Sequence, residues 1–211
     1  MLDLHDLFYS SCLDSYFKLE RGDGFALLRL IPEDGTNRLS RGCVLSLTEI
    51  LGELAGSAEP LIVAGNEKFF SVGADLREIN SLSGAEAYGF ARMGQALMNA
   101  ITRFPAPVYA AIEGHCMGGG LDLALSCSYR ITGPSAVFGH RGAALGLMTG
   151  WGGTQRLPRL VGKAKALEMF VVAEKITAAE ALRIGLVDAI VEDPVGEAVR
   201  RIQDVGSPRR H

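Results

Sequence analysis

Apolar and polar residues alternate with two different periods along the first third of the chain. Residues 16–20 and 25–31 alternate around a Gly-Asp-Gly sequence, which is typical of a β-hairpin. After a polar turn, Ser40 is placed to cap a helix whose apolar positions recur as far as Leu54. Residues 61–64 are apolar without a break, which predicts a short buried strand.

The same two kinds of pattern continue through the remainder of the chain. Strands are predicted at residues 108–112, 129–132, 136–139 and 186–191. Helices are predicted at residues 85–104, 163–173, 178–184 and 194–205. No repeat or low-complexity linker interrupts this order, so we predict an N-terminal arm, one core domain and a short C-terminal helix with a tail, at residues 1–15, 16–193 and 194–211.

The stretch from Pro105 to Ser126 carries the most information about function. A strand pattern ends there in Gly118, Gly119 and Gly120, and a helical pattern follows directly. Three residues without a Cβ atom leave the backbone open to a ligand. The first N–H groups of a helix have no partner inside the helix and lie at its positive end, so this turn is suited to hold an oxygen atom that gains negative charge.

Other interpretations of this glycine turn are weaker. A phosphate-binding P-loop requires Lys and Ser or Thr after its last glycine, whereas Leu121 and Asp122 follow Gly120. A dinucleotide-binding fingerprint requires a third glycine where Leu123 stands. Both nucleotide motifs are therefore excluded, and glycines that only allow close packing of helix and strand are the alternative.

A second glycine-to-helix turn occurs within residues 65–76. Gly73 lies in a loop after a strand pattern, and Ala74 resembles the start of a helical turn. The chain thus has two places where backbone N–H groups are available at the start of a helix.

The composition limits the cellular environments and the classes of partner that are expected for this chain. The chain has 211 residues, 48% of them hydrophobic, and a formal net charge of −3. A large core is expected, and the negative charge argues against nucleic acid as a partner. The longest apolar stretch contains charged residues, no signal peptide is recognisable, and the cysteines form no Cys-x-x-Cys pair. We therefore expect a cytoplasmic protein with no membrane partner and no metal site.

Several motifs in the same order resemble the crotonase, or enoyl-CoA hydratase/isomerase, family. They are FFSVGADLREI at 69–79, IEGHCMGGGLDLAL at 112–125, FGHRGAALGLMTGWGGTQRLPRLVG at 138–162 and AAEALRIGLVDAIV at 178–191. The likeness covers roughly residues 16–205 and implies an α/β, single-domain, crotonase-like spiral of ββα units. It also implies a homo-trimer or a hexamer built from two trimers. Family members usually continue with further helices after the last motif, so we expect a shortened C-terminal helical region and a weaker oligomer.

The resemblance implies a site for an acyl-CoA thioester. In this family two backbone N–H groups hold the thioester oxygen, and their places fall on Ala74 and Gly119, directly after Gly73 and Gly118. Proton abstraction, addition to a double bond and decarboxylation all pass through an enolate whose charge lies on that oxygen. One such donor typically contributes on the order of 10²–10³ in rate. Coenzyme A would be part of the substrate, so no separate cofactor is expected.

The CoA part of the substrate has its own candidates by the same resemblance. Arg38 lies in Asn-Arg-Leu-Ser, which is similar to the family's turn beside the CoA adenine. Asp75 belongs to the motif that ends in Arg77, a basic place that can face the CoA phosphates, and Lys68 is a further candidate. Each basic side chain is equally compatible with a solvated surface charge.

The acid–base residues depart from the family's pattern. Hydratases of this family use two glutamates, whose places fall on Asp122 and Gly142. Dienoyl-CoA isomerases have aspartate at the first place, but their further carboxylates would fall on Gly142 and Gly150. A mechanism with two carboxylates therefore cannot be written for this chain. Asp122 is the candidate acid or base, with a structural aspartate in a first helical turn as the alternative.

His140 and Trp151 complete the set of candidates. His140 precedes Gly142 by two residues and has a pKa range suited to proton transfer, with a structural histidine as the alternative. Trp151 stands where the family usually has a small residue, and it is either a core residue or a wall of the acyl pocket.

We therefore predict an acyl-CoA lyase or isomerase that stabilises a thioester enolate. With one carboxylate, double-bond isomerisation, decarboxylation or slow hydration is favoured over fast hydration. The alternative is a catalytically silent family member that binds an acyl-CoA or a partner subunit.

Overall fold

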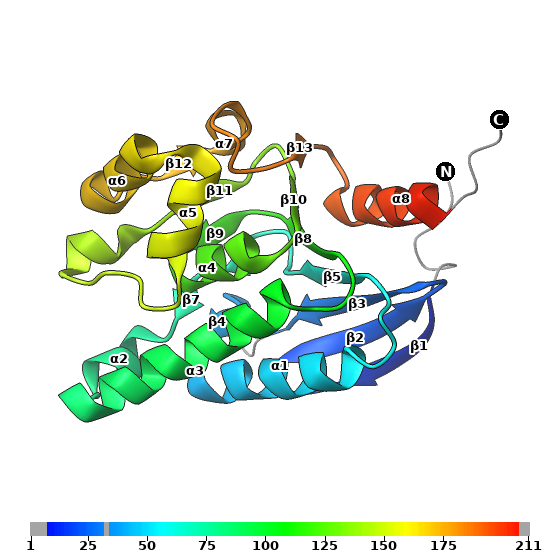
Figure 1. Cartoon of the computed structure of the whole chain (residues 1–211), viewed down its shortest axis with the longest axis horizontal. Helices are drawn as coiled ribbons and strands as arrows, with labels where there is room; N and C mark the ends of the chain where they lie inside the picture. The colour runs from blue at the N-terminus through cyan, green and yellow to red at the C-terminus, as the bar shows by residue number, and fades with distance from the viewer. Residues whose placement is uncertain (1–7, 32–33, 207–211) are drawn as a thin grey trace.

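The computed structural model describes residues 8–31 and 34–206, and within them a large sheet of seven strands organises the chain (Figure 1). The second strand pairs in antiparallel orientation with the first and with the third, and each later strand runs parallel to the strand before it in the sheet. Their order in the sheet is β1 (Phe8–Leu13), β2 (Phe17–Gly22), β3 (Phe25–Leu30), β5 (Leu61–Ala64), β8 (Val108–Ile112), β10 (Tyr129–Thr132) and β13 (Ala189–Ile190).

Two smaller sheets accompany the large one. One has the strand order β12 (Ile176–Thr177), β11 (Val137–Gly139), β9 (His115–Met117) and β6 (Phe69–Ser71), and the other pairs β4 (Arg38–Leu39) with β7 (Gly73–Ala74). Successive units give one strand to the large sheet and the next to the smaller one: β5 and β6, β8 and β9, β10 and β11. Helical segments follow each unit, so the chain winds as a spiral that extends both sheets together.

Several of the helices begin at a residue whose side chain caps them. Ser40 accepts a hydrogen bond from the Cys43 amide at 3.3 Å, and Ser83 forms a capping box with Glu86. Among the described helices, none is both long and apolar enough to cross a membrane. Their bounds are α1 (Arg41–Leu54), α2 (Leu76–Asn80), α3 (Gly84–Thr102), α4 (Gly119–Ser126), the 3₁₀ helix η2 (Arg141–Leu145), α5 (Gly153–Val161), α6 (Lys163–Val172), α7 (Ala178–Arg183) and α8 (Pro194–Gly206).

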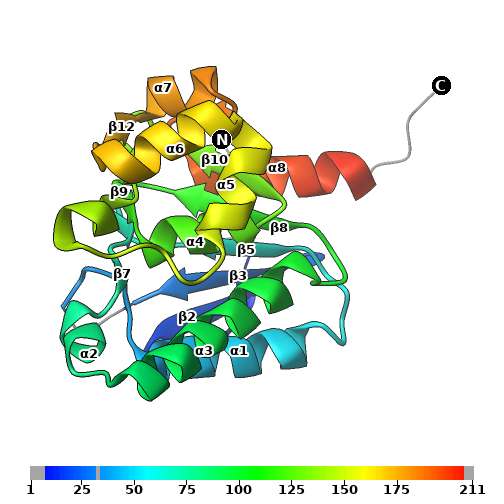
Figure 2. The ribbon, with the colours of Figure 1, turned by 60° about the vertical axis from the view of Figure 1, so that its left-hand side comes forward.

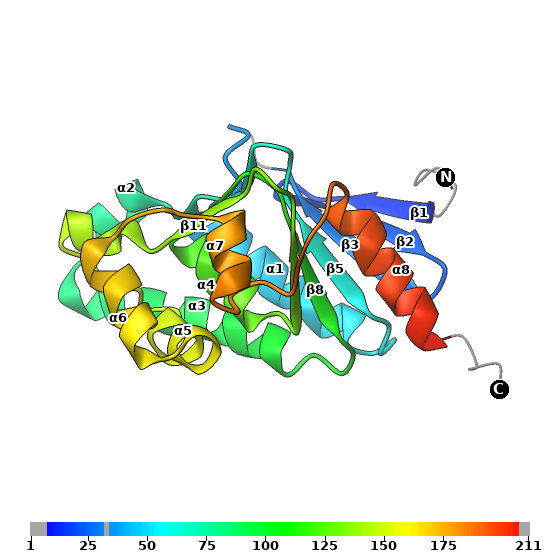
Figure 3. The same ribbon diagram turned by 90° about the horizontal axis from the view of Figure 1, so that it is seen from above.

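Both faces of the large sheet are buried, and successive side chains of each strand point to opposite faces. In β3, Ala26, Leu28 and Leu30 belong to the main core, which α1 and α3 cover. Phe25 and Leu27 point to the other face, where α8 lies across the sheet (Figure 3). This burial on two sides explains the uninterrupted apolar runs of β5 and β8.

The predicted elements are largely confirmed, and the differences are local. The arm expected at residues 1–15 contributes β1, which pairs with β2 through the backbone, while residues 1–7 lie outside the described part. Helix α5 was not predicted, because it starts in a glycine pair and contains Pro158. The two-residue strand β12 is too short to leave a pattern. The strand expected at 186–191 is limited to β13, the length over which it pairs with β10.

Candidate active site

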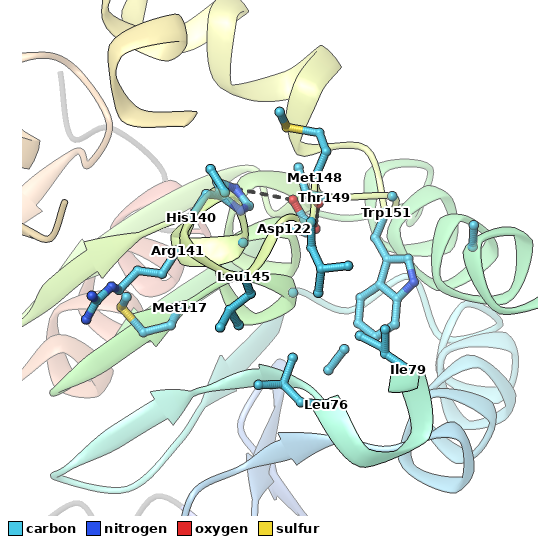
Figure 4. Close-up of a pocket in the computed structure, with 18 of the residues that line it drawn as sticks. Leu76, Ile79, Met117, Asp122, His140, Arg141, Leu145, Met148, Thr149 and Trp151 are labelled. Atoms are coloured by element: carbon cyan, nitrogen blue, oxygen red, sulfur yellow. Dashed lines mark hydrogen bonds and ion pairs between the residues drawn. The ribbon is translucent and has the colours of Figure 1, made fainter. Parts of the chain in front are cut away.

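A cavity of about 350 Å³ lies between α2 and α3 on one side and η2 with the loop before α5 on the other. Figure 2 shows this yellow-green segment facing α2 and α3 across the molecule. The turn from β9 into α4 closes the cavity toward the core. Apolar side chains form most of its wall (Figure 4), the larger ones being Leu76, Ile79, Phe90, Met117, Met148 and Trp151. Such a lining suits a mainly apolar organic group.

The two glycine turns meet at this cavity, but only the one at Gly118 leads directly into a helix. Gly73 and Ala74 form β7, and α2 begins at Leu76 after the cap residue Asp75, so the helical turn predicted to start at Ala74 was wrong by two residues. Gly73 and Gly118 have φ angles of 92° and 53°, a region that glycine adopts without strain. A Cβ atom built on Gly73 would lie 2.6 Å from the Gly119 nitrogen, and one built on Gly119 would lie 3.2 Å from the Ala74 nitrogen. The backbone amides of Ala74 and Gly119 are therefore neighbours, and both residues line the cavity together with Gly118.

Among the described residues that line the cavity, Asp122 is the acidic one. It lies in the first turn of α4, is 1% exposed and accepts a hydrogen bond from the hydroxyl of Thr149. Burial raises the pKa of its carboxyl to about 7, although the Thr149 hydroxyl and the charge of Arg156 act in the opposite direction. Asp122 therefore exchanges its proton near neutral pH.

His140 lies beside this carboxyl. Its Nε2 atom is 3.5 Å from Asp122 Oδ1, and its ring lies against that of Phe170. Burial lowers the pKa of His140 to about 4, so the imidazole is neutral at pH 7. Neither Nε2 nor Oδ1 has a hydrogen-bond partner among the described residues, and one proton held between them would satisfy both. Because burial disfavours charge on both groups, we regard them as a neutral pair and not as an ion pair.

Thr149 is a site residue that the sequence patterns did not indicate. It lies in the loop between η2 and α5, and its hydroxyl donates to Asp122 Oδ2. The available signal was a hydroxyl side chain in a glycine-rich loop, which is too common to point to a site. The contact depends on how this loop folds over α4.

The places of the further carboxylates are occupied by glycines that line the cavity, Gly142 and Gly150. The Gly142 carbonyl accepts a hydrogen bond from the Leu147 amide at 2.8 Å. A Cβ atom built on Gly142 would lie 2.8 Å from the Leu147 carbonyl oxygen. The backbone of this turn therefore closes the space in which a side chain would begin.

Trp151 forms the side of the cavity next to Gly119. It is 4% exposed, and its ring centroid lies 5.4 Å from that of Phe90. Trp151 lines the cavity and also belongs to the main hydrophobic core. Trp151 therefore contacts both the cavity and Phe90 of α3.

The basic candidates lie outside the cavity lining. Arg38 in β4 pairs with Asp34 at 2.9 Å and with Asp75 at 3.4 Å, so two carboxylates balance its charge. Arg77 is mostly exposed and lies 3.5 Å from Asp75, which caps α2. Because β4 pairs with β7, Arg38 and Asp75 lie near Ala74, whereas Lys68 is exposed in the loop before β6.

The described residues include no group of three His, Cys, Asp or Glu side chains that could hold a metal ion. The cavity instead combines neighbouring backbone amides, one carboxyl with a pKa near 7 and a neutral imidazole. Such a site is chemically able to hold an oxygen atom that gains negative charge and to move one proton.

The sequence is similar to a known family and to individual members of it. A sequence profile of the family described as enoyl-CoA hydratase/isomerase matches residues 20–207. A probable enoyl-CoA hydratase of Bacillus subtilis is 41% identical over 174 residues, which cover 81% of this chain and 67% of the relative. The crotonyl-CoA hydratase of Syntrophomonas wolfei is 37% identical over 177 residues, which cover 82% of this chain and 68% of the relative.

Solved structures show the same architecture. A crystal structure of an enoyl-CoA hydratase from Bacillus anthracis matches with a TM-score of 0.86 and 32% identity, and the match covers 92% of this chain and 77% of the other. This likeness confirms the predicted crotonase-like spiral.

Proposed function

Because this chain belongs to the enoyl-CoA hydratase/isomerase family, we propose that it binds an acyl-CoA thioester and stabilises the enolate of that thioester. One observation carries the proposal. A buried carboxyl with a pKa of about 7 lies at the same cavity as the neighbouring amides of Ala74 and Gly119. A carboxyl that exchanges its proton near neutral pH is suited to general acid–base catalysis.

In the proposed reaction the thioester oxygen accepts hydrogen bonds from the Ala74 and Gly119 amides. Asp122 removes a proton from the carbon next to the carbonyl, and the electron pair of that C–H bond moves onto the oxygen. The two amides stabilise the resulting charge, each contributing on the order of 10²–10³ in rate. The proton then resides on Asp122, beside the neutral imidazole of His140.

A single carboxyl favours double-bond isomerisation over fast hydration. In isomerisation, the group that takes the proton from one carbon returns it to another, so Asp122 suffices. Hydration needs one group to activate water while a second supplies or accepts a proton, and Gly142 offers none. The relatives named above are hydratases, so hydration is the competing reaction, and decarboxylation of a malonyl-type thioester needs no base.

For the CoA part of the substrate, we propose contacts from the exposed Arg77 and from Arg38 and Lys68. Asp75 would position these arginines, because it pairs with Arg38 and caps the turn that carries Arg77. Gly73 and Gly118 would allow the thioester to approach the backbone closely.

The test is turnover of a panel containing a 3-enoyl-CoA, a 2-enoyl-CoA and a malonyl-type thioester. We expect isomerisation of the 3-enoyl-CoA to exceed hydration, and Asp122→Asn to lower kcat by about 10²–10⁴-fold. Glu113→Gln is a matched control, since burial raises the pKa of this carboxyl too but it does not line the cavity. Hydration faster than isomerisation, or unchanged turnover in Asp122→Asn, would contradict the proposal.

The pH dependence provides a second check. Asp122 acts first as a base, so its ionised form is the active one, and ionisation increases as pH rises through about 7. The value of kcat/KM for isomerisation should therefore rise through pH 7 and level off above it. Decarboxylation would lack this rise.

The silent alternative rests on the missing second carboxylate. A member that only binds would show affinity for acyl-CoA in calorimetry but no turnover of any thioester in the panel. Any turnover that disappears in Asp122→Asn excludes this alternative.

A further inference from the structure

Trp151, the single tryptophan of the sequence, lies beside the two backbone amides. A Cβ atom built on Gly119 would lie 2.7 Å from Cζ3 and 2.8 Å from Cε3 of the indole. The six-membered ring of Trp151 therefore lies directly against Gly119, which lines the cavity. Figure 4 shows this indole extending past Thr149 toward Ile79, on the opposite side of Asp122 from Arg141.

A second glycine holds the other edge of the indole. A Cβ atom built on Gly94 would lie 2.2 Å from Trp151 Nε1 and 2.3 Å from Cδ1. Glycine in the middle of a helix is destabilising relative to alanine, so α3 gives up stability at the position where the indole needs space. Gly94 and Gly119 together fix Trp151 between α3 and α4, and Phe90 packs against its ring.

We infer that Trp151 is the residue that sets acyl specificity: its indole forms a rigid wall beside the reacting carbons and rejects acyl groups that are branched there. The inference rests on the proposed function, because the thioester oxygen at the Ala74 and Gly119 amides places the neighbouring carbon close to this ring. A straight acyl group passes along the wall. A methyl branch on the carbon next to the carbonyl would meet a ring that has no room to retreat.

The expected preference for the straight acyl group can be estimated from how strongly hydrophobic pockets distinguish ligands that differ by one carbon group. One extra carbon group against a hydrophobic wall typically changes selectivity by roughly 10–200-fold. Trp151→Ala removes the wall and should abolish this discrimination, while the amides that hold the oxygen stay in place. A tryptophan with only a packing role would instead weaken the binding of all acyl groups alike.

Two isomeric ligands test the inference by calorimetry. Pentanoyl-CoA and 2-methylbutanoyl-CoA have the same atoms and differ only in the branch. We expect the wild type to bind the straight isomer at least about tenfold more tightly, and Trp151→Ala to bring the ratio of the two Kd values near one. Trp151→Phe, a smaller change that keeps an aromatic ring, should give an intermediate ratio and serves if Trp151→Ala fails to fold. An unchanged ratio in the folded variants would overturn the inference.

The fluorescence of the single tryptophan gives an independent readout in the unmodified protein. We expect pentanoyl-CoA to shift or quench the emission at saturation and CoA without an acyl group to change it much less. Equal responses to the two ligands, or no response while calorimetry detects pentanoyl-CoA binding, would overturn the inference. Absence of binding for every acyl-CoA in calorimetry would instead contradict the proposed function, so the two failures are distinguishable.

Discussion

Asp122 and His140 are buried side by side, and burial shifts their pKa values in opposite directions. The pKa of Asp122 is raised from 3.8 to about 7, so its contribution to stability is present at low pH and is lost as pH rises through this window. The pKa of His140 is lowered from 6.5 to about 4, so its contribution is present above pH 6.5 and is lost as pH falls. In the wild type the contributions of Asp122 and His140 to stability change in opposite directions over nearly the same pH range.

We predict that replacing either residue makes the pH dependence of stability due to the other one measurable. In Asp122→Asn the free energy of unfolding should rise between about pH 4.5 and 6.5, by up to about 3 kcal/mol, because only the histidine titrates. In His140→Gln it should fall between about pH 4.5 and 7, because only the aspartate titrates. Urea unfolding at several pH values measures both slopes. Parallel curves for the two variants would contradict the opposed shifts.

Gly119 is the residue at which packing and the proposed chemistry meet. We predict that Gly119→Ala lowers kcat by about 10²-fold or more, as loss of one oxyanion donor does. The added methyl would lie 3.2 Å from the Ala74 nitrogen and 2.7 Å from Trp151 Cζ3, so it would crowd an oxygen atom that binds to the two amides, as the proposed function requires. The measurement is kcat on the preferred thioester, together with the thermal midpoint.

Gly94→Ala is the matched control for this substitution. Its methyl would also press on Trp151, at 2.2 Å from Nε1, but from the side of α3 and away from the two amides. If a displaced indole alone reduced activity, both variants would lose kcat to the same degree. A much larger loss in Gly119→Ala assigns the effect to the oxygen site.

At the scale of elements, the backbone of the η2 turn leaves too little room for a second carboxylate at position 142. We predict that Gly142→Glu lowers stability and does not give fast crotonyl-CoA hydration, because its Cβ would lie 2.8 Å from the Leu147 carbonyl oxygen. Gly150→Glu offers the comparison, since the nearest contact of its Cβ is that of Ala91 at an ordinary 3.6 Å. It should change the free energy of unfolding by less than about 0.5 kcal/mol. Thermal unfolding and a hydration assay of both variants measure this difference.

At the scale of the whole molecule, α8 covers the face of the large sheet that is remote from the cavity. Val199 is 3% exposed and packs with Phe25, Leu27 and Tyr109 in a separate cluster. We predict that Val199→Asp lowers the free energy of unfolding by roughly 3 kcal/mol or more, because it buries an unpaired charge. Val199→Ala should cost about 2 kcal/mol, since it removes two buried carbon groups, and its kcat should be unaffected. Urea unfolding ranks the two, and equal stability in all three proteins would contradict the role of α8.

Exposed apolar side chains on α6 are relevant to the oligomeric state of the protein. On α6, Leu167, Val171 and Val172 are more than half exposed, and exposed apolar side chains of this kind mark contact surfaces. We predict a particle of three chains, each of 22.5 kDa, or of two such trimers, in sedimentation velocity experiments. A single species with the mass of one chain at micromolar concentration would contradict this prediction.

Much of the architecture could be predicted because it depends on local features. The hairpin of β2 and β3, the capped starts of α1 and α3, and the strand that leads into the glycine triplet all appear in the sequence as periods and caps. Elements without a local signal were missed. Strand β1 is defined by its pairing with β2, and α5 contains Pro158 but buries Leu157 completely against the core.

The sequence by itself determined the family and the glycine triplet that leads into α4, since motif order, missing Cβ atoms and a helix start are properties of the chain as written. The pairing of Gly73 and Ala74 with β4, which delays α2 to Leu76, depends on a strand that is distant in the sequence. Only the tertiary structure decided that Asp122, His140 and Thr149 meet, because they come from separate elements. The same holds for the indole held between Gly94 and Gly119. A pKa near 7 for an aspartate also depends on the burial that these elements produce together, which no local pattern contains.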